Sequence, residues 1–237
     1  MILKKFEELP INMKNKKVKE YYDVLSKKKF SLVMKRIFDI FFSLMLLILL
    51  SPILLILAIV IKIDSKGPVF YRQERVTTNG KIFRIFKFRT MVQNADQIGT
   101  LVTVGNDTRI TRVGKVIRKV RLDEIPQLIN ILKGEMTFVG TRPEVKKYVD
   151  KYTDEMMATL LMPAGVTSIA SIKYKDEDEI LEKAVNAGKD TDVAYVEDVL
   201  PGKMKYNLEY IKQFSVLHDL KICIDTVIGV LRYEKYM

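Results

Sequence analysis

Residues Ile40 to Ile61 read IFFSLMLLILLSPILLILAIVI, an unbroken apolar run with Ser51 and Pro52 near its middle. No charged residue interrupts it. As a straight helix it would be about 33 Å long at 1.5 Å per residue, close to the thickness of the hydrocarbon core of a bilayer. Length and composition therefore predict a membrane helix.

Pro52 predicts a break in this helix. Proline removes one backbone donor and clashes with the carbonyl four residues earlier, so the helix should kink. Each arm would then measure roughly 15–18 Å, about half a bilayer. The backbone freed at a kink needs a hydrogen-bond partner in lipid, and the Ser51 hydroxyl is a local candidate.

Basic residues flank the apolar run on both sides. They are Lys27, Lys28, Lys29, Lys35 and Arg36 before it, and Lys62, Lys66, Arg72 and Arg75 after it. Because basic residues mark the cytoplasmic side of a membrane, a hairpin that enters and leaves by one face satisfies both flanks. A spanning helix satisfies only one. The residues alone leave both arrangements open, and the flanks favour re-entry.

The composition restricts the class of protein. A chain of 237 residues suffices for one or two domains with a real core. The net charge of +11 fits nucleic acid, an anionic leaflet or phosphorylated substrates, and the apolar run argues against nucleic acid. The single Cys223 excludes an intrachain disulfide and suits a reducing compartment. The lysine-rich segment Met1 to Phe30 is either a juxtamembrane segment on anionic lipid or a solvated, partly disordered tail.

The first half of the chain after the apolar run predicts a hairpin and two helices. VFYRQERV and KIFRIFKFRTM flank the turn 77–80, TTNG, and Asn-Gly between aromatic and β-branched segments indicates a β-hairpin. Apolar residues at helical spacing predict an amphipathic helix from Thr108. A second helix should begin around Asp123, tolerate Pro126 in its first turn and end at Gly134.

The second half should be mostly helical. A short strand, MTFVG, precedes Thr141 and Glu144, whose capping-box spacing predicts a helix through Met157 or beyond. VTSIASIKY, residues 166–174, is predicted to be a strand, and an amphipathic helix is expected over 215–233. One compact, mostly helical domain that rests on the membrane is the simplest organisation.

The adjacent acids Asp123 and Glu124 are the first candidate for chemistry. They could be only a helix cap. However, the nearby cations Arg118, Lys119 and Arg121 place them in positive potential, which should keep both carboxylates ionised, as a nucleophile or metal ligand requires. Adjacent carboxylates can also divide labour between attack or metal binding and proton adjustment.

Three further motifs have weaker signals. GTRP, residues 140–143, would form an anion site if it opens a helix, and Lys87 in KFR could meet phosphate at the end of the hairpin. The acidic cluster 176–179 could hold a metal, although a solvated helix start is the favoured interpretation. His218 is the only histidine, which argues against His-rich metal sites and a Ser-His-Asp triad.

Taken in order, four segments carry a family resemblance: KRIFDIFFSLMLLILLSPILL, GPVFYRQERV, IFKFRTM and RLDEIPQLINILKGEMTFVGTRP. They resemble the bacterial sugar transferases, the monotopic phosphoglycosyl transferases. The resemblance is dense from Lys35 to Pro143 and resumes more weakly at VTSIASIKY and LPGKMKYNLEYIKQFSVLHDLKICIDTV. The joint match is far more specific than any single piece.

The resemblance implies an α+β, mostly helical, monotopic membrane protein. Its re-entrant helix-break-helix anchor would break at Ser51-Pro52, beside a small β-hairpin and a compact cytoplasmic catalytic domain. Residues 1–34 would form a basic juxtamembrane leader, 35–66 the re-entrant segment and 67–237 the catalytic domain. The expected location is the cytoplasmic face of the bacterial inner membrane. Without the multi-span N-terminal region of larger members, the chain looks like a minimal catalytic unit.

The resemblance also implies an activity. Family members transfer a sugar-1-phosphate from a UDP-sugar to a polyprenyl phosphate such as undecaprenyl phosphate, release UMP and use Mg²⁺. This step would initiate the synthesis of an exopolysaccharide, capsule, lipopolysaccharide or glycoconjugate. By similarity, Asp123 would be the nucleophile of an aspartyl phosphosugar intermediate and a metal ligand, with Glu124 as its partner. The residues implied to bind substrate are Lys87, Arg118, Arg142 and Asp219.

The partners implied are the two substrates and an anionic lipid surface, without nucleic acid, and a homo-oligomer stays open. The chain departs from the family pattern at PAGVTSIASIKYKDEDE and at Thr141 in GTRP, which leaves the sugar and the acceptor contacts open. Two alternatives remain. One is a non-enzymatic, membrane-anchored scaffold that binds lipid or a partner. The other is a metal-dependent glycosyltransferase that uses Asp176 and Asp178 and releases UDP.

Overall fold

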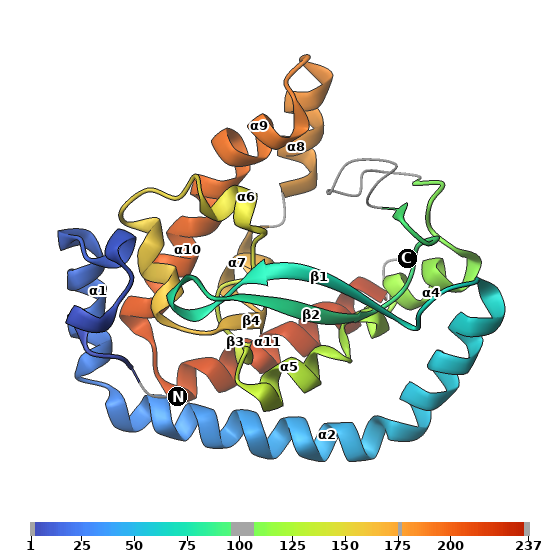
Figure 1. Ribbon diagram of the computed structural model, residues 1–237, viewed down its shortest axis with the longest axis horizontal. Coiled ribbons are helices and arrows are strands. Elements are labelled where there is room, and N and C mark those ends of the chain that lie inside the picture. Colours follow the sequence, from blue (N-terminus) through green and yellow to red (C-terminus); the bar gives the residue numbers. More distant parts are fainter. Residues whose placement is uncertain (1–2, 96–106, 175–176, 235–237) are drawn as a thin grey trace.

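Helix α2 (Lys29–Asp64) runs along one entire side of the molecule (Figure 1). The computed structural model describes residues 3–95, 107–174 and 177–234, without the side chains of residues 178 and 230–234. By length and composition α2 could cross a membrane, and only 6% of its most apolar stretch is buried. The core helix of a soluble protein would be mostly buried. The surface of α2 instead faces outward.

The other elements are short and pack on one side of α2. The helices are α1 (Lys16–Ser26), α4 (Arg112–Lys119), α5 (Gln127–Lys133), α6 (Lys146–Val149), α7 (Ile169–Lys173), α8 (Glu177–Asn186), α9 (Thr191–Ala194), α10 (Leu200–Gln213) and α11 (Val216–Glu234). The strands are β1 (Phe70–Val76), β2 (Ile82–Phe88), β3 (Met136–Val139) and β4 (Ala164–Thr167). The expected fold class, mostly helical with a small antiparallel hairpin and one long apolar helix, is confirmed.

The proline in α2 is accommodated as the sequence predicts. The amide that Pro52 lacks would have bonded the carbonyl of Ile48, four residues earlier. The Ser51 hydroxyl donates to that same carbonyl over 2.8 Å. The expected break therefore takes the form of a bend: α2 continues through Pro52 as one helix and turns toward the body at its C-terminal end (Figure 1).

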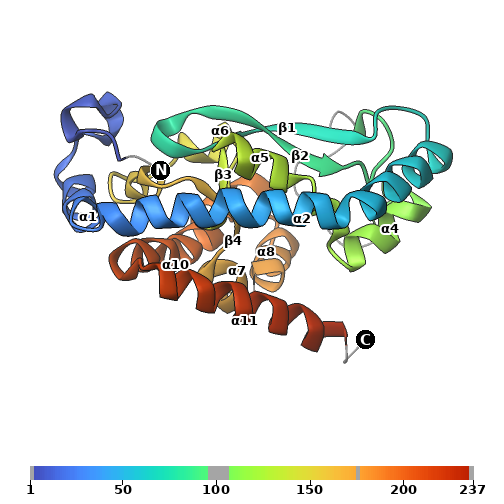
Figure 2. The ribbon, with the colours of Figure 1, turned by 90° about the horizontal axis from the view of Figure 1, so that it is seen from below.

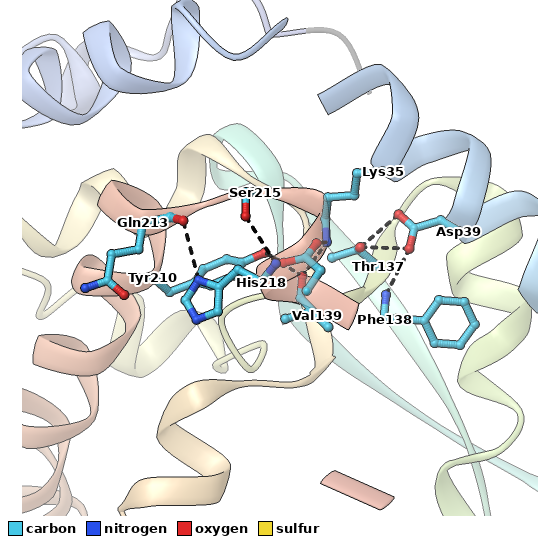
Figure 3. A network of polar contacts seen from close by, with 10 residues as sticks. Lys35, Asp39, Thr137, Phe138, Val139, Tyr210, Gln213, Ser215 and His218 are labelled. Carbon is cyan, nitrogen blue, oxygen red and sulfur yellow. Dashed lines mark hydrogen bonds and ion pairs between the residues drawn. The ribbon is translucent and has the colours of Figure 1, made fainter. Parts of the chain in front are cut away.

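The N-terminal half of α2 is attached to the body by polar contacts, which Figure 3 shows in part. The buried Lys35 ammonium donates to the Asp219 carboxylate on α11 and to the carbonyl of Val139 on β3, the latter over 2.8 Å. One turn later, Asp39 accepts hydrogen bonds from the Thr137 hydroxyl over 2.8 and 2.9 Å. Lys35 is thus bonded within the protein rather than to lipid, and it does not belong to the basic flank counted from the sequence.

Arg36 was also counted in the basic flank, and it too is bonded within the protein. Its guanidinium donates to the carbonyls of Ile131 and Leu132, over 2.6 and 2.8 Å, at the end of α5. These carbonyls are among the four that every helix leaves without a partner at its C-terminus. Arg36 therefore ties α2 to α5.

The C-terminal half of α2 is attached to the same body by apolar packing. Ile61 is buried with Phe88 of β2 and Ile117 of α4. The Asp64 carboxylate accepts a 3.2 Å hydrogen bond from the amide of Val113, in the first turn of α4. Both ends of α2 consequently contact one body, and Figure 2 shows α2 crossing its whole width with α11 beside it.

The predicted hairpin is confirmed. Strands β1 and β2 pair antiparallel, from Phe70 opposite Phe88 to Val76 opposite Ile82. In the turn, Asn79 (φ 56°) and Gly80 (φ 72°) adopt the left-handed conformation that asparagine and glycine tolerate best. The local turn chemistry was therefore sufficient to identify this element.

The strand predicted at MTFVG is confirmed as β3, but its pairing into a second sheet was not predicted from the sequence. Strands β3 and β4 pair in parallel, with Met136 opposite Ala164 and Val139 opposite Thr167. Gly165 lies within β4, and a Cβ on it would be only 2.2 Å from the amide nitrogen of Gly140, the residue after β3. The two chain segments can approach this closely only because a glycine stands there.

The strand predicted over residues 166–174 is wrong beyond Thr167. The Ser168 hydroxyl accepts a 2.9 Å hydrogen bond from the amide of Ser171 and caps α7. A serine in this position ends a strand and starts a helix because it satisfies an amide that the helix leaves unpaired. The β-branched residues in the segment misled the sequence prediction.

The long helix predicted from Thr141 to Met157 is also wrong. No helix forms over residues 140–145, and α6 covers only four residues. Glu144 closes no capping box. Its carboxylate instead accepts a 2.6 Å hydrogen bond from the hydroxyl of Tyr195. A buried tertiary partner therefore overrides the local capping pattern.

The two helices around the acidic pair differ from the prediction only at their starts. Helix α4 begins at Arg112, because the Thr111 hydroxyl accepts from the amide of Gly114 over 2.9 Å and caps it. The helix expected from Asp123 is divided into a 3-10 helix (Leu122–Glu124) and α5. It ends at Gly134 (φ 79°), as predicted.

The lysine-rich leader packs on the body. Met13, Val18 and Leu25 are fully buried in the largest core cluster. The Tyr21 hydroxyl donates to the Glu155 carboxylate over 2.6 Å. The interpretation as a solvated tail is therefore wrong for residues 3–26.

Candidate active site

The acidic pair lies on the 3-10 helix between α4 and α5. Arg121, immediately before it, has φ 53°, a left-handed conformation that is uncommon for a residue other than glycine. This conformation turns the chain between α4 and the pair. Backbone strain of this kind is concentrated at functional sites. Asp123 and Glu124 are thereby presented toward β2 and the segment that follows β3.

Two cations hold Glu124. Lys87 Nζ lies 2.8 Å from Glu124 Oε1, and Arg142 Nη2 lies 3.1 Å from the same oxygen. The Glu124 side chain is only 14% exposed, so these pairs are weakly screened by solvent. Burial raises the pKa of Glu124, but Arg142 and Lys87 outweigh it and hold this pKa well below its usual range. Glu124 is thus anionic at neutral pH, as the sequence predicts.

Asp123 behaves differently from its neighbour. Burial raises its pKa, and Lys87 and Arg118 lower it without offsetting the burial. Cations therefore dominate at Glu124, whereas desolvation outweighs them at Asp123. Asp123 is the more basic of the two carboxylates, and greater basicity suits a nucleophile.

The pairing with Glu124 also affects the pKa values of Lys87 and Arg142. Burial lowers the pKa of Lys87, and Glu124 acts against that effect. Glu124 raises the pKa of Arg142, and the more distant Glu144 and Glu177 act in the same direction. Arg142 therefore stands between the acidic pair and a second group of carboxylates. No helix begins at residues 140–143, so the helix N-terminus expected there contributes no anion site.

The structure gathers five of the six predicted catalytic and binding residues. They are Asp123, Glu124, Lys87, Arg142 and, acting on the Asp123 pKa, Arg118. We refer to the first four as the dyad cluster.

Asp219 is the exception. One of its carboxylate oxygens accepts from Lys35 and the other from the Tyr210 hydroxyl over 2.7 Å, and Figure 3 labels both donors. This carboxylate connects α11 to α2 and α10, away from the other five residues, and its expected role in substrate binding stays a prediction.

A small cavity adjoins the dyad cluster, and sequence reasoning missed it. It has a volume of about 180 Å³, and Arg142 forms one of its walls. The other lining residues that matter here are Arg75, Glu144, Glu177, Tyr195 and Lys203. No local motif signals this site, because its residues come from β1, the segment after β3, α8, the turn after α9 and α10. The sequence drew attention to three of these residues for other reasons: Arg75 in the basic flank, Glu144 as a helix cap and Glu177 in the acidic cluster 176–179.

The dyad cluster fits a metal ion only if phosphate oxygens of the substrate supply further ligands. Among the described residues, no group of three or more Asp, Glu, His or Cys side chains gathers in one place. Mg²⁺ is usually held by one or two carboxylates together with substrate phosphates. Asp123, beside the cations that would receive a diphosphate, fits that pattern. In the alternative acidic cluster, Asp176 and the Asp178 side chain lie outside the described residues.

Comparison with known proteins identifies the family. The model for bacterial sugar transferase matches residues 30–233. The chain is 36% identical over 200 residues to UDP-N-acetylgalactosamine-undecaprenyl-phosphate N-acetylgalactosaminephosphotransferase of Aeromonas hydrophila, over 83% of this chain and 43% of the relative. It is 36% identical over 203 residues to UDP-glucose:undecaprenyl-phosphate glucose-1-phosphate transferase of Klebsiella pneumoniae, over 83% and 40%.

A shorter relative matches nearly from end to end. This is the exopolysaccharide production protein PSS of Rhizobium leguminosarum bv. phaseoli, 34% identical over 212 residues that cover 86% of this chain and 98% of the relative. The chain spans about two fifths of the length of the first two relatives. The family model matches most of the chain, and the residues of the dyad cluster lie within the matched range. The chain therefore belongs to the bacterial sugar transferase family.

Proposed function

We propose that the protein transfers a sugar-1-phosphate from a UDP-sugar to undecaprenyl phosphate, or a similar polyprenyl phosphate, and releases UMP. The observation that carries this proposal is the dyad cluster. It combines a desolvated, more basic Asp123 with a Glu124 that Lys87 and Arg142 keep ionised. The names of the relatives, which specify UDP-sugars and undecaprenyl phosphate, support the substrate classes.

The chemistry would proceed in two displacements at one phosphorus atom. An Asp123 carboxylate oxygen attacks the phosphorus that bears the sugar, the bond to the bridging oxygen breaks, and UMP leaves with that oxygen. A phosphate oxygen of the lipid acceptor then attacks the same phosphorus. The acyl phosphate bond breaks, the Asp123 carboxylate is restored, and the product is a polyprenyl diphosphate sugar.

The cations would bind and orient the donor. Arg142 is 39% exposed at its side chain and can receive phosphate oxygens while it still contacts Glu124. Lys87 and Arg118 would lower the charge repulsion between the attacking carboxylate and the diphosphate. Mg²⁺, when bound with Asp123 as a ligand, would neutralise further charge on the diphosphate. Glu124 would hold Lys87 and Arg142 in place.

We place this activity at the cytoplasmic face of the bacterial inner membrane. Both halves of α2 contact the same body, which supports a monotopic arrangement, because a straight spanning helix would carry one half away from it. Exposed apolar side chains cover α2 and one face of the adjacent α11. On α11 they are Leu217, Leu220, Ile224, Val227 and Ile228. A surface of this extent requires lipid or a partner.

A single assay tests the proposal. Purified protein is incubated with Mg²⁺, undecaprenyl phosphate and each of a panel of UDP-sugars, and the nucleotide released is identified. UMP is the expected product. Release of UDP would instead support the glycosyltransferase alternative. No nucleotide release with any donor, together with unchanged lipid binding after replacement of Asp123 and Glu124, would support the non-enzymatic scaffold.

A further inference from the structure

The cavity beside Arg142 contains a buried polar network. The Tyr195 hydroxyl donates to Glu144 Oε1 over 2.6 Å and accepts from Lys203 Nζ over 2.9 Å. Lys203 also donates to Glu177 over 3.0 Å. Tyr195 is 4% exposed, and Glu144 and Lys203 are 7% exposed. Burying polar groups is costly unless they are hydrogen-bonded, and here the three groups and Glu177 satisfy one another.

We infer that this cavity binds the glycosyl group of the donor. The inference rests on the proposed function and adds to it the place where the sugar is recognised. Arg142 links the two sites, since it contacts Glu124 on one side and lines the cavity on the other. A donor whose diphosphate lies on Arg142 can therefore place its sugar in the cavity while the phosphorus faces Asp123.

The charges of the cavity favour a neutral ligand. Arg75 and Lys203 face two carboxylates, Glu144 and Glu177, and Arg142 is already paired with Glu124. The opposite charges are therefore balanced two against two, whereas a site for a second phosphate would have an excess of cations.

The groups present are suited to hydroxyls. The Tyr195 and Lys203 contacts with Glu144 both end on the same oxygen, Oε1. A carboxylate offers about four acceptor positions, so Glu144 retains capacity for sugar hydroxyl donors. The rings of Tyr148 and Tyr195 pack against each other at the wall, with centroids 4.5 Å apart.

The volume of the cavity favours the sugar over the nucleoside as its ligand. A volume of about 180 Å³ is smaller than the roughly 300–1,000 Å³ of pockets that enclose drug-sized ligands. One sugar ring suits this space better than a whole nucleoside.

The positions of the lining residues in the sequence fit a role in selecting the sugar. The relatives reported above share the lipid acceptor in their names but differ in the sugar, N-acetylgalactosamine in one and glucose in the other. A residue set that selects the sugar must therefore be separate from the dyad that performs the common step. Glu177 and Tyr195 lie outside all the segments that carry the family resemblance.

Two variants test this inference, Tyr195→Phe and Lys203→Met. Equilibrium binding is measured in an Asp123→Asn background, which prevents loss of the bound donor. The ligands are UDP and the UDP derivatives of glucose, galactose, N-acetylglucosamine and N-acetylgalactosamine. We expect each variant to weaken the best UDP-sugar by about tenfold, the effect of one hydrogen bond to a charged group, and to change the order of preference. The affinity for UDP, which has no sugar, should stay within about twofold.

Lys205→Met is the matched control, because Lys205 lies on the same helix but is exposed. It should change neither the affinity for any UDP-sugar nor that for UDP. Equal losses for UDP and UDP-sugars in Tyr195→Phe would show that the cavity binds the nucleotide, and unchanged UDP-sugar affinity in both variants would show that it binds no part of the donor. Either result overturns the inference. Because this assay measures binding alone, it is independent of whether UMP is released, which is the test of the proposed function.

Discussion

Asp123 and Glu124 are neighbours in sequence, yet their surroundings give them opposite electrostatic properties. Glu124 points its Oε1 at two cations, so its charge is stabilised. Asp123 is affected more by the loss of water than by the cations near it. Two adjacent carboxylates with pKa values moved in opposite directions are a recurrent sign of divided roles in catalysis.

The role of Asp123 is tested by Asp123→Asn. The amide keeps the size of the side chain but removes the nucleophilic oxygen, so UMP release should fall by about 10³-fold or more. No phosphosugar adduct should be trapped on the variant. Asp150→Asn, an exposed aspartate paired with Lys146, is the control and should retain full activity. Wild-type turnover in Asp123→Asn would exclude this residue as the nucleophile.

The pH dependence of kcat/KM is expected to report on Asp123. Attack requires the ionised carboxylate, so activity should decline as the pH falls through the pKa of Asp123. Because burial raises this pKa, the decline should begin above the ordinary aspartate value of about 3.9. Lys87→Met removes a cation that lowers this pKa, so the acid limb should move to higher pH. If the acid limb of Lys87→Met stays in place or moves to lower pH, the limb reports on a group other than Asp123.

At the scale of elements, α2 is held at its N-terminal half by charges and at its C-terminal half by packing. The buried Lys35 and Asp219 connect α2 to α11, and Lys35 also bonds the Val139 carbonyl of β3. Three residues after Val139 the chain reaches Arg142. The position of the membrane helix and the position of a dyad cation therefore depend on one strand.

Removal of one partner in this network should be costly. Lys35→Met leaves the Asp219 carboxylate buried without its cation, and the free energy of unfolding should fall by about 3–5 kcal/mol. Chemical denaturation in detergent measures this. The double variant Lys35→Met/Asp219→Leu should lose less than Lys35→Met alone, since no unpaired charge remains. Lys19→Met removes a half-exposed pair and should change stability by less than about 1 kcal/mol. Equal effects of Lys19→Met and Lys35→Met would show that the buried network adds no stability.

At the scale of the whole molecule, α2 and α11 lie beside each other (Figure 2), and both carry exposed apolar side chains. The dyad cluster comes from β2, the 3-10 helix Leu122–Glu124 and the segment after β3. Shallow insertion of such a face would bring the body to the level of the lipid headgroups. A lipid phosphate could then reach Asp123 without leaving the bilayer.

The topology is tested by cysteines on each side of the apolar run, Lys27→Cys and Lys66→Cys, both at exposed positions. If both ends of α2 are attached to one body in the membrane, an impermeant thiol reagent should label both from the cytoplasmic side only. Burial raises the pKa of the native Cys223 thiol to about 11, so its background reaction should be slow. Labelling of the two sites from opposite sides would show that α2 spans the bilayer.

Several features followed from the sequence because their causes are local. The Asn-Gly turn determines the hairpin, Gly134 ends α5, and the Ser51 hydroxyl compensates for the amide that Pro52 lacks. The dyad and its two cations could also be named from their motifs. In each case the deciding contact or conformation involves residues close in the chain, or the motif itself is specific.

Tertiary structure alone decided the rest. The Lys35–Asp219 pair joins residues 184 positions apart, and the Tyr195–Glu144 bond joins residues 51 apart. Contacts between residues so far apart leave no periodic pattern in the sequence. The partners of Asp219 and Glu144 could therefore not be predicted, and the two residues were expected at the substrate and at a helix cap. The desolvation that raises the pKa of Asp123 has the same origin. Burial is a property of the folded chain, and a sequence lists charges without saying which of them lose their water.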